Sequence, residues 1–365
     1  MTMGNRRTTS FRAGGAFSAG GRYSRRQVLT AGPGLAAMAA GIGADPAAAA
    51  GKVVMSVQGG DYARLLRDII DIPLTHASGI EVVQDIADEP SRAAKIYVQR
   101  DLARGTVDVS SNSVAVNYKL AQAGVLEPLD STRIRNLAHV LPEFRDRFIA
   151  AQFFSPQVLV YNPAAVSPPP QSFSDLLDPR YHGKVGFPSG SYFNILLAAS
   201  LLQTGGPNEI DRAKPLIRQL NDNGLRLYPS VDSIAPAFAS GEIVLGMMGM
   251  ARVVMWQNEG FKMAAAFPRE GCIIYESGMV VPRNAPDKAS AFRYLDAMLA
   301  PAAQEGFAAR MGYTPAVDDA PLTGKIAGQL RIQGPRPKMI APDYGYTSRV
   351  QDDVSTWWNK LISRS

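Results

Sequence analysis

The sequence of 365 residues has little of what most enzymes use at their active sites. It contains one cysteine, Cys272, and three histidines, His76, His139 and His182. One cysteine forms neither an internal disulfide nor a cysteine zinc site, and we expect it to be a small buried hydrophobic residue. The histidines stand far apart, and no G-x-S-x-G, H-E-x-x-H or Walker pattern occurs. We therefore expect no enzyme activity, no metal and no cofactor.

A large excess of charge is also missing once the first 50 residues are set aside. The formal net charge is +6, but residues 1–50 contain six Arg and one Asp. The remaining 315 residues contain 32 basic and 31 acidic residues. This balance leaves no electrostatic footprint for a polyanion, so no nucleic-acid partner is expected. Beyond residue 50, no segment without charges is long enough to span a membrane.

The basic residues gather in a leader. Residues 22–50 read RYSRRQVLTAGPGLAAMAAGIGADPAAAA, with two arginines before a weakly apolar stretch and an alanine run that offers A-x-A cleavage sites. SRRQVL resembles the twin-arginine export motif. The apolar run is short and glycine-rich for a membrane span of about 20 residues. We predict a signal peptide over residues 1–50, cleaved near Ala49 or Ala50, and a soluble mature protein outside the cytoplasmic membrane.

The mature chain predicts an α/β protein. Its length suits two domains, and 46% hydrophobic with 19% charged residues is ordinary globular composition. Residues 53–57 read as a strand, residues 63–79 as a helix ending at Gly79, and residues 80–86 as a second strand. This order predicts a parallel β-α-β unit. Helices over residues 92–105 and 115–130, with a strand at residues 107–113 between them, complete one lobe.

A second α/β lobe is predicted after residue 156. A strand-like run at residues 157–161 precedes a proline-rich segment and helices over residues 194–206 and 208–224. Residues 275–282 read as a strand that returns to the first lobe. We expect crossings between lobes near residues 154–161, 280–282 and 313–315. The predicted division is residues 51–156 plus 283–312 for lobe 1, and residues 157–282 plus 313–365 for lobe 2.

Two lobes joined by several crossings enclose a cleft, and ligands of open α/β sheets lie beyond the carboxyl ends of the strands. The segments at those ends are rich in Gly, Ser, Asn and Gln, which allow close backbone approach and orient a ligand. These segments are SVQGGDY, VSSNS, FPSGSYF, MGMARV and YESG.

Four segments carry a resemblance to a known family. They are SFSDLLDPRYHGKVGFP (172–188), GEIVLGMMGMARVVMWQNEG (241–260), YESGMVVPRNAPDKASAFRYLDAMLAP (275–301) and MGYTPAV (311–317). In order and spacing the chain resembles the periplasmic solute-binding proteins of ABC importers, in the spermidine/putrescine-binding group. The resemblance implies a two-lobed type II periplasmic-binding-protein fold that closes on a ligand. It also implies a monomer that serves a permease and an ATPase of the inner membrane.

Arg252 is the only charge in the run IVLGMMGMARVVMWQ, residues 243–257. A buried cation needs a negative partner, which Glu242, Glu259 or a ligand could supply. Alternatively, the side chain could point into water. The run predicts a strand ending near Met250 and then a helix, whose N-terminus also favours an anion. Some family members with amino-acid-like ligands carry an Arg here that pairs with a carboxylate. We therefore expect a ligand with a carboxylate or other anionic group, either amino-acid-like or opine-like.

Three alternatives stay open. A polyamine is one, although the Asp that grips an ammonium in polyamine binders corresponds here to Ser277, with Glu276 one place earlier. A one-residue shift in a strand turns the side chain to the other face. A periplasmic hydrolase is the second, because a Ser-His-Asp site can be assembled from distant residues. A binding protein that serves a receptor is the third. Iron-binding relatives use adjacent tyrosines, which are missing here.

The remaining candidate ligand contacts each have a structural alternative. The first loop could be an ordinary turn, the serines could cap helices, Tyr275 could pack between the lobes, and Glu276 could be solvated. The candidates besides Arg252 are Gln58, Gly59, Gly60, Asp61, Ser110, Ser111, Asn112, Ser189, Ser191, Tyr192, Tyr275, Glu276 and Ser277.

Overall fold

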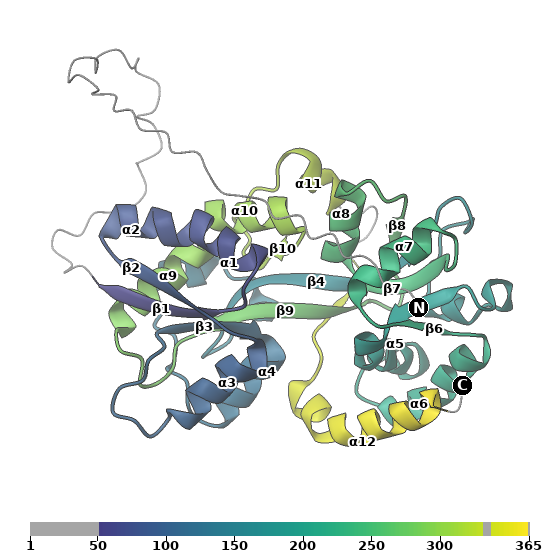
Figure 1. The fold of residues 1–365 in the computed structure, drawn as a ribbon, viewed down its shortest axis with the longest axis horizontal. Helices are drawn as coiled ribbons and strands as arrows, with labels where there is room; N and C mark the ends of the chain where they lie inside the picture. Colours follow the sequence, from purple (N-terminus) through teal and green to yellow (C-terminus); the bar gives the residue numbers. More distant parts are fainter. Residues whose placement is uncertain (1–50, 331–336, 364–365) are drawn as a thin grey trace, which may run out of the picture. The chain divides into compact units, whose positions relative to one another are not determined.

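The computed structural model describes residues 51–330 and 337–363 (Figure 1). The predicted signal peptide lies outside the described residues. No helix within the described ranges combines the length and the apolar character needed to cross a membrane.

The first part of the sheet forms as predicted. Strand β1 (Lys52–Val57) pairs in parallel with β2 (Glu81–Ile86) and with β3 (Val109–Ser113). The chain between β1 and β2 forms α1 (Asp61–Leu66), a π-helical turn (Arg67–Asp71) and α2 (Ile72–Ser78). Gly79 ends α2 in the left-handed conformation (φ 71°), which glycine adopts without strain.

Two helices end earlier than predicted. Helix α3 (Glu89–Val98) stops seven residues before Gly105, because the carbonyls of Gln99 and Leu102 accept hydrogen bonds from Asn284. Helix α4 (Val114–Gln122) is followed by Gly124 at φ 68°, and its apolar continuation leaves the helix. Tertiary hydrogen bonds and a glycine thus override the helical spacing.

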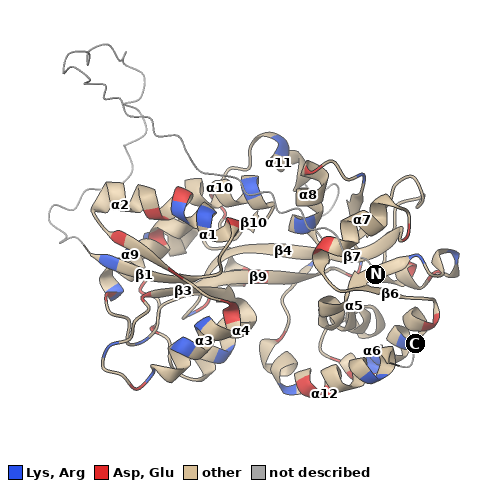
Figure 2. Ribbon diagram, viewed as in Figure 1, with Lys and Arg blue, Asp and Glu red and all other residues tan. Residues whose placement is uncertain are grey.

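Two long antiparallel strands cross the middle of the sheet. In β4 (Ala150–Tyr161), residues 150–156 pair with β9 (Cys272–Val280), whereas residues 157–161 pair with β7 (Leu245–Gly249) and partly with β8 (Ala264–Ala266). All twelve residues of β4 are buried and none is charged (Figure 2). This strand therefore belongs to both parts of the sheet and joins them.

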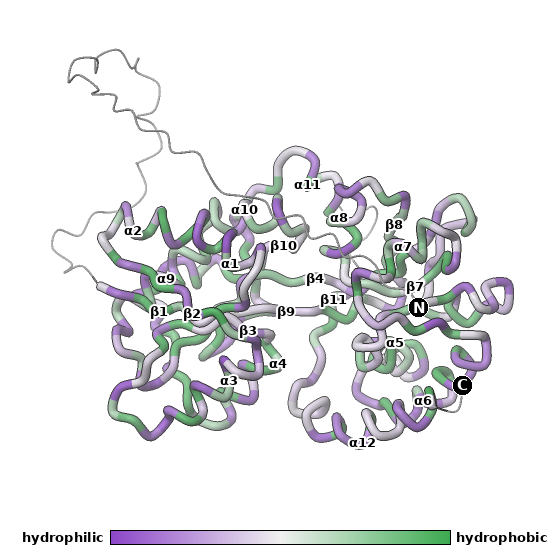
Figure 3. Tube along the Cα trace, in the orientation of Figure 1, coloured by the Kyte–Doolittle hydropathy of each residue, from purple (hydrophilic) through white to green (hydrophobic). Residues whose placement is uncertain are grey.

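The second part of the sheet adds parallel strands to β7. Strand β5 (Val185–Pro188) pairs with β7 and with β6 (Arg226–Tyr228). Helix α5 (Tyr192–Thr204) is buried over residues 195–201, and Figure 3 shows hydrophobic residues along it and along β4. The other helices here are α6 (Ile210–Asp222), α7 (Ile234–Ala239), α8 (Met250–Asn258) and α12 (Tyr344–Ile362).

Short elements complete the described chain. Strands β10 (Thr314–Pro315) and β11 (Met339–Ile340) pair with β4 and β9. The remaining α-helices are α9 (Lys288–Leu299), α10 (Pro301–Met311) and α11 (Gly324–Gln329). The 3₁₀ segments are η2 (Arg135–His139), η3 (Pro142–Phe144), η4 (Phe173–Leu177), η5 (Pro179–Tyr181), η6 (Ser189–Ser191) and η7 (Val231–Ser233).

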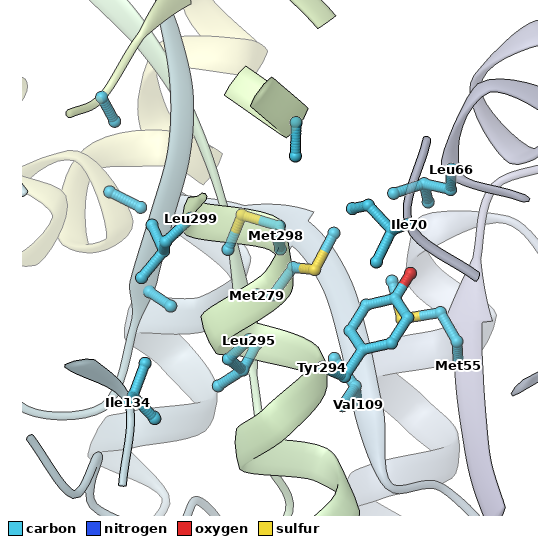
Figure 4. Packing of buried hydrophobic residues seen from close by; sticks show 14 of the residues in the cluster. Met55, Leu66, Ile70, Val109, Ile134, Met279, Tyr294, Leu295, Met298 and Leu299 are labelled. Carbon is cyan, nitrogen blue, oxygen red and sulfur yellow. The ribbon is translucent and has the colours of Figure 1, made fainter. Parts of the chain in front are cut away.

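The first core lies between β1, β3, β9 and the helices α1 and α9. Figure 4 shows Tyr294 and Met279 among Met55, Leu66 and Ile70. The Tyr294 hydroxyl donates a 2.9 Å hydrogen bond to the buried Asp71 carboxylate, whose pKa is raised by burial. Cys272 is fully buried, as predicted, and burial raises the pKa of its thiol to about 12.

The expected lobe boundaries stay a prediction. The two parts share β4 and β9, so the sheet itself has no break between them. Residues 277–280 of β9 pair with β3 of the first part.

Strand β9 carries one carboxylate into the interior. Glu276 lies opposite Phe154 of β4 and is only 8% exposed, so it is not solvated. No hydrogen bond or ion pair to Glu276 is found within residues 51–330 and 337–363. Burial, and next the charge of Asp146, raise the pKa of Glu276 to about 8 from its ordinary 4.5.

The substitution Glu276→Gln tests whether the Glu276 carboxyl group is buried with a raised pKa. Between about pH 4.5 and pH 8, the raised pKa lets the folded protein bind more protons at Glu276 than the unfolded chain does. The free energy of unfolding therefore falls as pH rises through this window. We expect the glutamine variant to be more stable at pH 9, by up to about 4 kcal/mol, with the difference lost near pH 4. Denaturant unfolding at several pH values measures it. Glu259→Gln, at an exposed position, is the control, and equal pH profiles for Glu276→Gln and wild type would contradict the assignment.

Candidate functional site

Three tyrosines from distant parts of the chain lie near one another: one in α1, one in β9 and one just before β10. We call Tyr62, Tyr275 and Tyr313 the tyrosine cluster. The rings of Tyr275 and Tyr313 are 6.3 Å apart, and Tyr313 stacks on Phe153 at 4.1 Å. Tyr62 packs edge-on against the same phenylalanine at 6.2 Å. Burial raises the pKa of all three phenols, so each stays neutral at physiological pH.

The cluster still opens to solvent through Tyr275. Tyr275 is 41% exposed. Protein groups nevertheless surround its phenol and raise its pKa by desolvation, and Tyr313 and Glu89 add to this effect. Tyr275 is therefore the member of the cluster that a molecule in solvent can reach. Aromatic rings are common in the lining of small-molecule sites.

A β-bulge in β4 places a polar side chain against the tyrosine cluster. The register between β4 and β9 shifts between Ala151 and Phe153, so that Gln152 is the extra residue. Its Oε1 accepts a 2.6 Å hydrogen bond from the Tyr62 hydroxyl, which lies 2.8 Å from the Ser111 hydroxyl. The Gln152 Nε2 is buried and lacks a hydrogen-bond partner among the described residues. The bulge therefore fixes Tyr62 and leaves one donor unused beside it.

Arg92 is a buried cation behind Ser111. Its side chain donates to the carbonyl of Ser111 at 2.8 and 3.2 Å and to the carbonyl of Ala87 at 2.5 Å. No carboxylate lies within 4.0 Å of it in the described parts of the chain. Burial lowers the pKa of Arg92, and the charge of Glu89 opposes this. The arginine thus holds the end of β3 by hydrogen bonds to carbonyl oxygens.

Arg252 lies near Tyr313 and is half-buried, with 37% of its side chain exposed. Helix α8 begins directly after β7, as predicted, and Arg252 is its third residue. Its nearest carboxylate is Asp232, at a loose 3.7 Å, and that side chain is 86% exposed. The charge of Arg252 acts on the Tyr313 phenol, where it opposes the rise in pKa caused by burial.

Neither carboxylate suggested from the sequence pairs with Arg252. Glu242 pairs with Arg226 at 2.9 Å, and Glu259 follows the far end of α8. The first turn of α8 is held instead by Ser155 of β4, whose hydroxyl accepts a 3.0 Å hydrogen bond from the Ala251 N–H. Gly312 (φ 69°) packs against this turn, where a Cβ would meet Val254 at 2.8 Å.

The predicted residues of β3 divide between its two faces. Ser111 reaches the tyrosine cluster, whereas Asn112 donates to Ser110 at 3.1 Å and to Asn117 at 2.9 Å. Asn117 in turn donates to the carbonyl of Gly278 in β9. Alternation along a strand explains this division. Ser110 and Asn112 therefore join β3, α4 and β9.

The other predicted residues have mixed surroundings. Gln58, Gly60 and Asp61 are exposed and Gly59 is half-buried, in the turn before α1, where Asp61 pairs with Arg64. Ser277 is buried and donates to the carbonyl of Asn112. Ser189 is exposed, Ser191 precedes α5 without a side-chain cap bond, and Tyr192 stacks on Trp358 of α12 at 5.5 Å. Glu276 points to the face opposite Tyr275 and Ser277. Ligand contact stays a prediction for each residue.

Sequence reasoning missed four residues of this arrangement: Tyr62, Gln152, Arg92 and Tyr313. Tyr62 directly follows the predicted turn, and Tyr313 lies in the MGYTPAV segment, so both had a local signal. Gln152 and Arg92 had none, because a bulge and a buried arginine are set by strand pairing across the sheet.

The chain is similar to known solute-binding proteins in sequence and in fold. Residues 73–330 match the family described as bacterial extracellular solute-binding protein. Spermidine/putrescine-binding periplasmic protein 1 of Haemophilus influenzae is 25% identical over 256 residues, 66% of this chain and 69% of that protein. A gamma-aminobutyric acid-binding protein of Pseudomonas aeruginosa is 23% identical over 255 residues, 67% of this chain and 70% of that protein.

The fold agrees with the family match. A putative extracellular solute-binding protein from Bordetella parapertussis superposes with a TM-score of 0.77 at 18% identity, over 85% of this chain and 98% of that one. The fold is the two-lobed type II periplasmic-binding-protein fold that the sequence predicted. These relatives are named for the binding of solutes. Because the family match covers more than half of its length, the chain belongs to the bacterial extracellular solute-binding proteins, which capture small molecules for ABC importers.

Proposed function

We propose that this protein captures a small organic ligand with a carboxylate or other anionic group, amino-acid-like or opine-like, and delivers it to a permease and an ATPase of the inner membrane. It is exported to the periplasm by the twin-arginine route and acts as a monomer. The observation that carries the choice of ligand is Arg252, a half-buried guanidinium whose nearest carboxylate is loosely placed and exposed.

The energetics favour an anion at Arg252. The loose contact with Asp232, 3.7 Å away and almost fully in solvent, is worth little. A ligand carboxylate in bidentate contact forms charged hydrogen bonds worth roughly 1.5–3 kcal/mol. The first turn of α8 adds partial positive charge at the same place. An anion thus gains more here than the exposed aspartate does.

The tyrosine cluster suits the rest of an amino-acid-like ligand. Three neutral rings give an apolar wall, and the face of a tyrosine attracts an ammonium group. Glu89 acts on Tyr275 from the first part of the sheet, whereas Arg252 belongs to the second. A zwitterion would therefore find opposite charges at its two ends. The relative named for gamma-aminobutyric acid is consistent with this ligand class.

A polyamine is the second candidate, because one relative is named for spermidine and putrescine. Ser277 stands where polyamine binders of the resembling group carry an Asp, and its hydroxyl is engaged with Asn112. Arg252 would repel a polyamine. The two ligand classes therefore predict opposite effects of removing this charge.

Arg252→Ala should weaken binding of the cognate acid by about tenfold to a hundredfold while the fold survives. Arg252→Lys should recover only part of the affinity, because an ammonium cannot reproduce the bidentate fork. Calorimetric titration with amino acids, opine-like acids and polyamines measures this. Arg226→Ala, which removes a cation already paired with Glu242, is the control. Tight polyamine binding that the Arg252→Ala variant keeps or improves would show the proposal to be wrong.

Ligand binding should close the lobes as rigid bodies about the crossings in β4, β9 and β10. A ligand that contacts both lobes stabilises the closed state, because only contacts made in that state shift the equilibrium. Solution scattering should show a smaller radius of gyration at saturation. The Arg252→Ala variant at the same ligand concentration should keep the larger radius. An unchanged radius for saturated wild type would argue for a rigid scaffold.

Bound ligand should be released chemically unchanged. The motivation is the absence of any catalytic motif from the sequence. Incubation of the mature protein with a metabolite mixture, followed by mass spectrometry of bound and free fractions, tests this. Conversion of the bound compound at a rate above the buffer blank would favour the hydrolase instead.

A further inference from the structure

One histidine and two aspartates, residue types that often bind metal ions, lie close together outside the candidate ligand site. His139 ends η2, and Asp318 and Asp319 follow β10; we call these three residues the His139 cluster. The Nδ1 of His139 is 3.1 Å from Asp318 Oδ1 and 3.4 Å from Asp319 Oδ2. One donor atom of each residue lies within 4.8 Å of the other two. Three ligand atoms at these separations can surround one ion with little movement.

The backbone holds the cluster in place. Residues 139 and 318 are far apart in sequence, but Val140 and Val317 form an antiparallel bridge. The Asp318 N–H donates to the His139 carbonyl at 2.9 Å, and the Leu141 N–H donates to the Ala316 carbonyl at 2.9 Å. Val140 and Val317 are buried in the first core. Both segments are therefore fixed before any ion binds, which lowers the entropy cost of binding.

The charges of the cluster are incompletely matched. Neither aspartate has a Lys or Arg nitrogen within 4.0 Å in the parts of the chain that the structure describes. The Oδ1 of Asp319 is shielded from solvent and has no hydrogen-bond partner among the described residues. The Asp319 oxygen that faces His139 is Oδ2, at 3.4 Å, so Oδ1 is a second oxygen of the same carboxylate and has no partner among the described residues. A buried oxygen of this kind costs free energy unless a cation or water meets it.

We propose that the His139 cluster binds one divalent first-row transition metal, with Zn²⁺ the best fit. Imidazole nitrogen and carboxylate oxygen are both zinc ligands, so these three side chains would supply three ligand atoms and leave the fourth position to solvent. Mg²⁺ and Ca²⁺ prefer all-oxygen sites, so the imidazole selects against them. Asp318 is 58% exposed, which gives the ion a path from solvent. This departs from the sequence-based expectation of no metal and is independent of the proposed ligand.

The test is calorimetric titration of the EDTA-treated mature protein with ZnCl₂. We expect saturable binding of one Zn²⁺ per chain that millimolar Mg²⁺ or Ca²⁺ does not displace. His139→Ala and Asp319→Asn should each weaken Zn²⁺ binding by about tenfold or more. His182→Ala, which removes an exposed histidine elsewhere, should bind as wild type and control for adventitious imidazole contacts.

Thermal unfolding provides the second readout. Zn²⁺ should raise the unfolding temperature of wild type and of His182→Ala but not of His139→Ala, because only a folded site that binds the ion gains stability from it. Lack of saturable Zn²⁺ binding by wild type up to about 1 mM, or equal binding by wild type, His139→Ala and Asp319→Asn, would overturn the proposal. If His139→Ala does not fold, Asp319→Asn and the wild-type titration decide.

Discussion

The pairing of β4 with β9 is the constraint on which the rest of the structure depends. Strand β4 is buried along all twelve residues and pairs first with β9 and then with β7. Burying a strand on both faces requires an apolar sequence without charges, which residues 150–161 supply. The same strand therefore belongs to both parts of the sheet, and any movement between them bends β4 and β9. The bulge at Gln152 sits in this pairing and directs a polar side chain to Tyr62.

Three charged side chains are wholly or partly buried, and each is accommodated in a different way. Arg92 is satisfied by carbonyl oxygens, Glu276 has a raised pKa that favours its neutral form, and Arg252 stays half exposed. These are three physical answers to one problem, the desolvation of an ion. Of these three, Arg252 alone keeps access to solvent and lacks a close partner.

Much of the fold follows from local patterns in the sequence. The β-α-β start, the helix end at Gly79, and the switch from β7 to α8 before Arg252 all depend on short-range spacing and were predicted. The ends of α3 and α4 were not. Asn284, 182 and 185 residues away from Leu102 and Gln99, takes the carbonyls that would continue α3, and Gly124 follows α4. The site divides in the same way. Ser111 and Arg252 were selected from the sequence and lie near the tyrosine cluster. The partner of Arg252 and the direction of Tyr192 depend on η7 and α12, whose packing no local pattern encodes.

A short stretch after α10 connects the features that matter most. Gly312 allows close approach to α8, Tyr313 joins the tyrosine cluster, and Thr314 and Pro315 pair with β4. Two residues further on, the bridge from Val317 ties the chain to η2 and the first core. Because these anchors lie within a few residues, the ring of Tyr313 has little freedom to move away from Phe153. Backbone pairing on both sides thus fixes Tyr313, so ordering this side chain adds little to the free-energy cost of binding any ligand that contacts it.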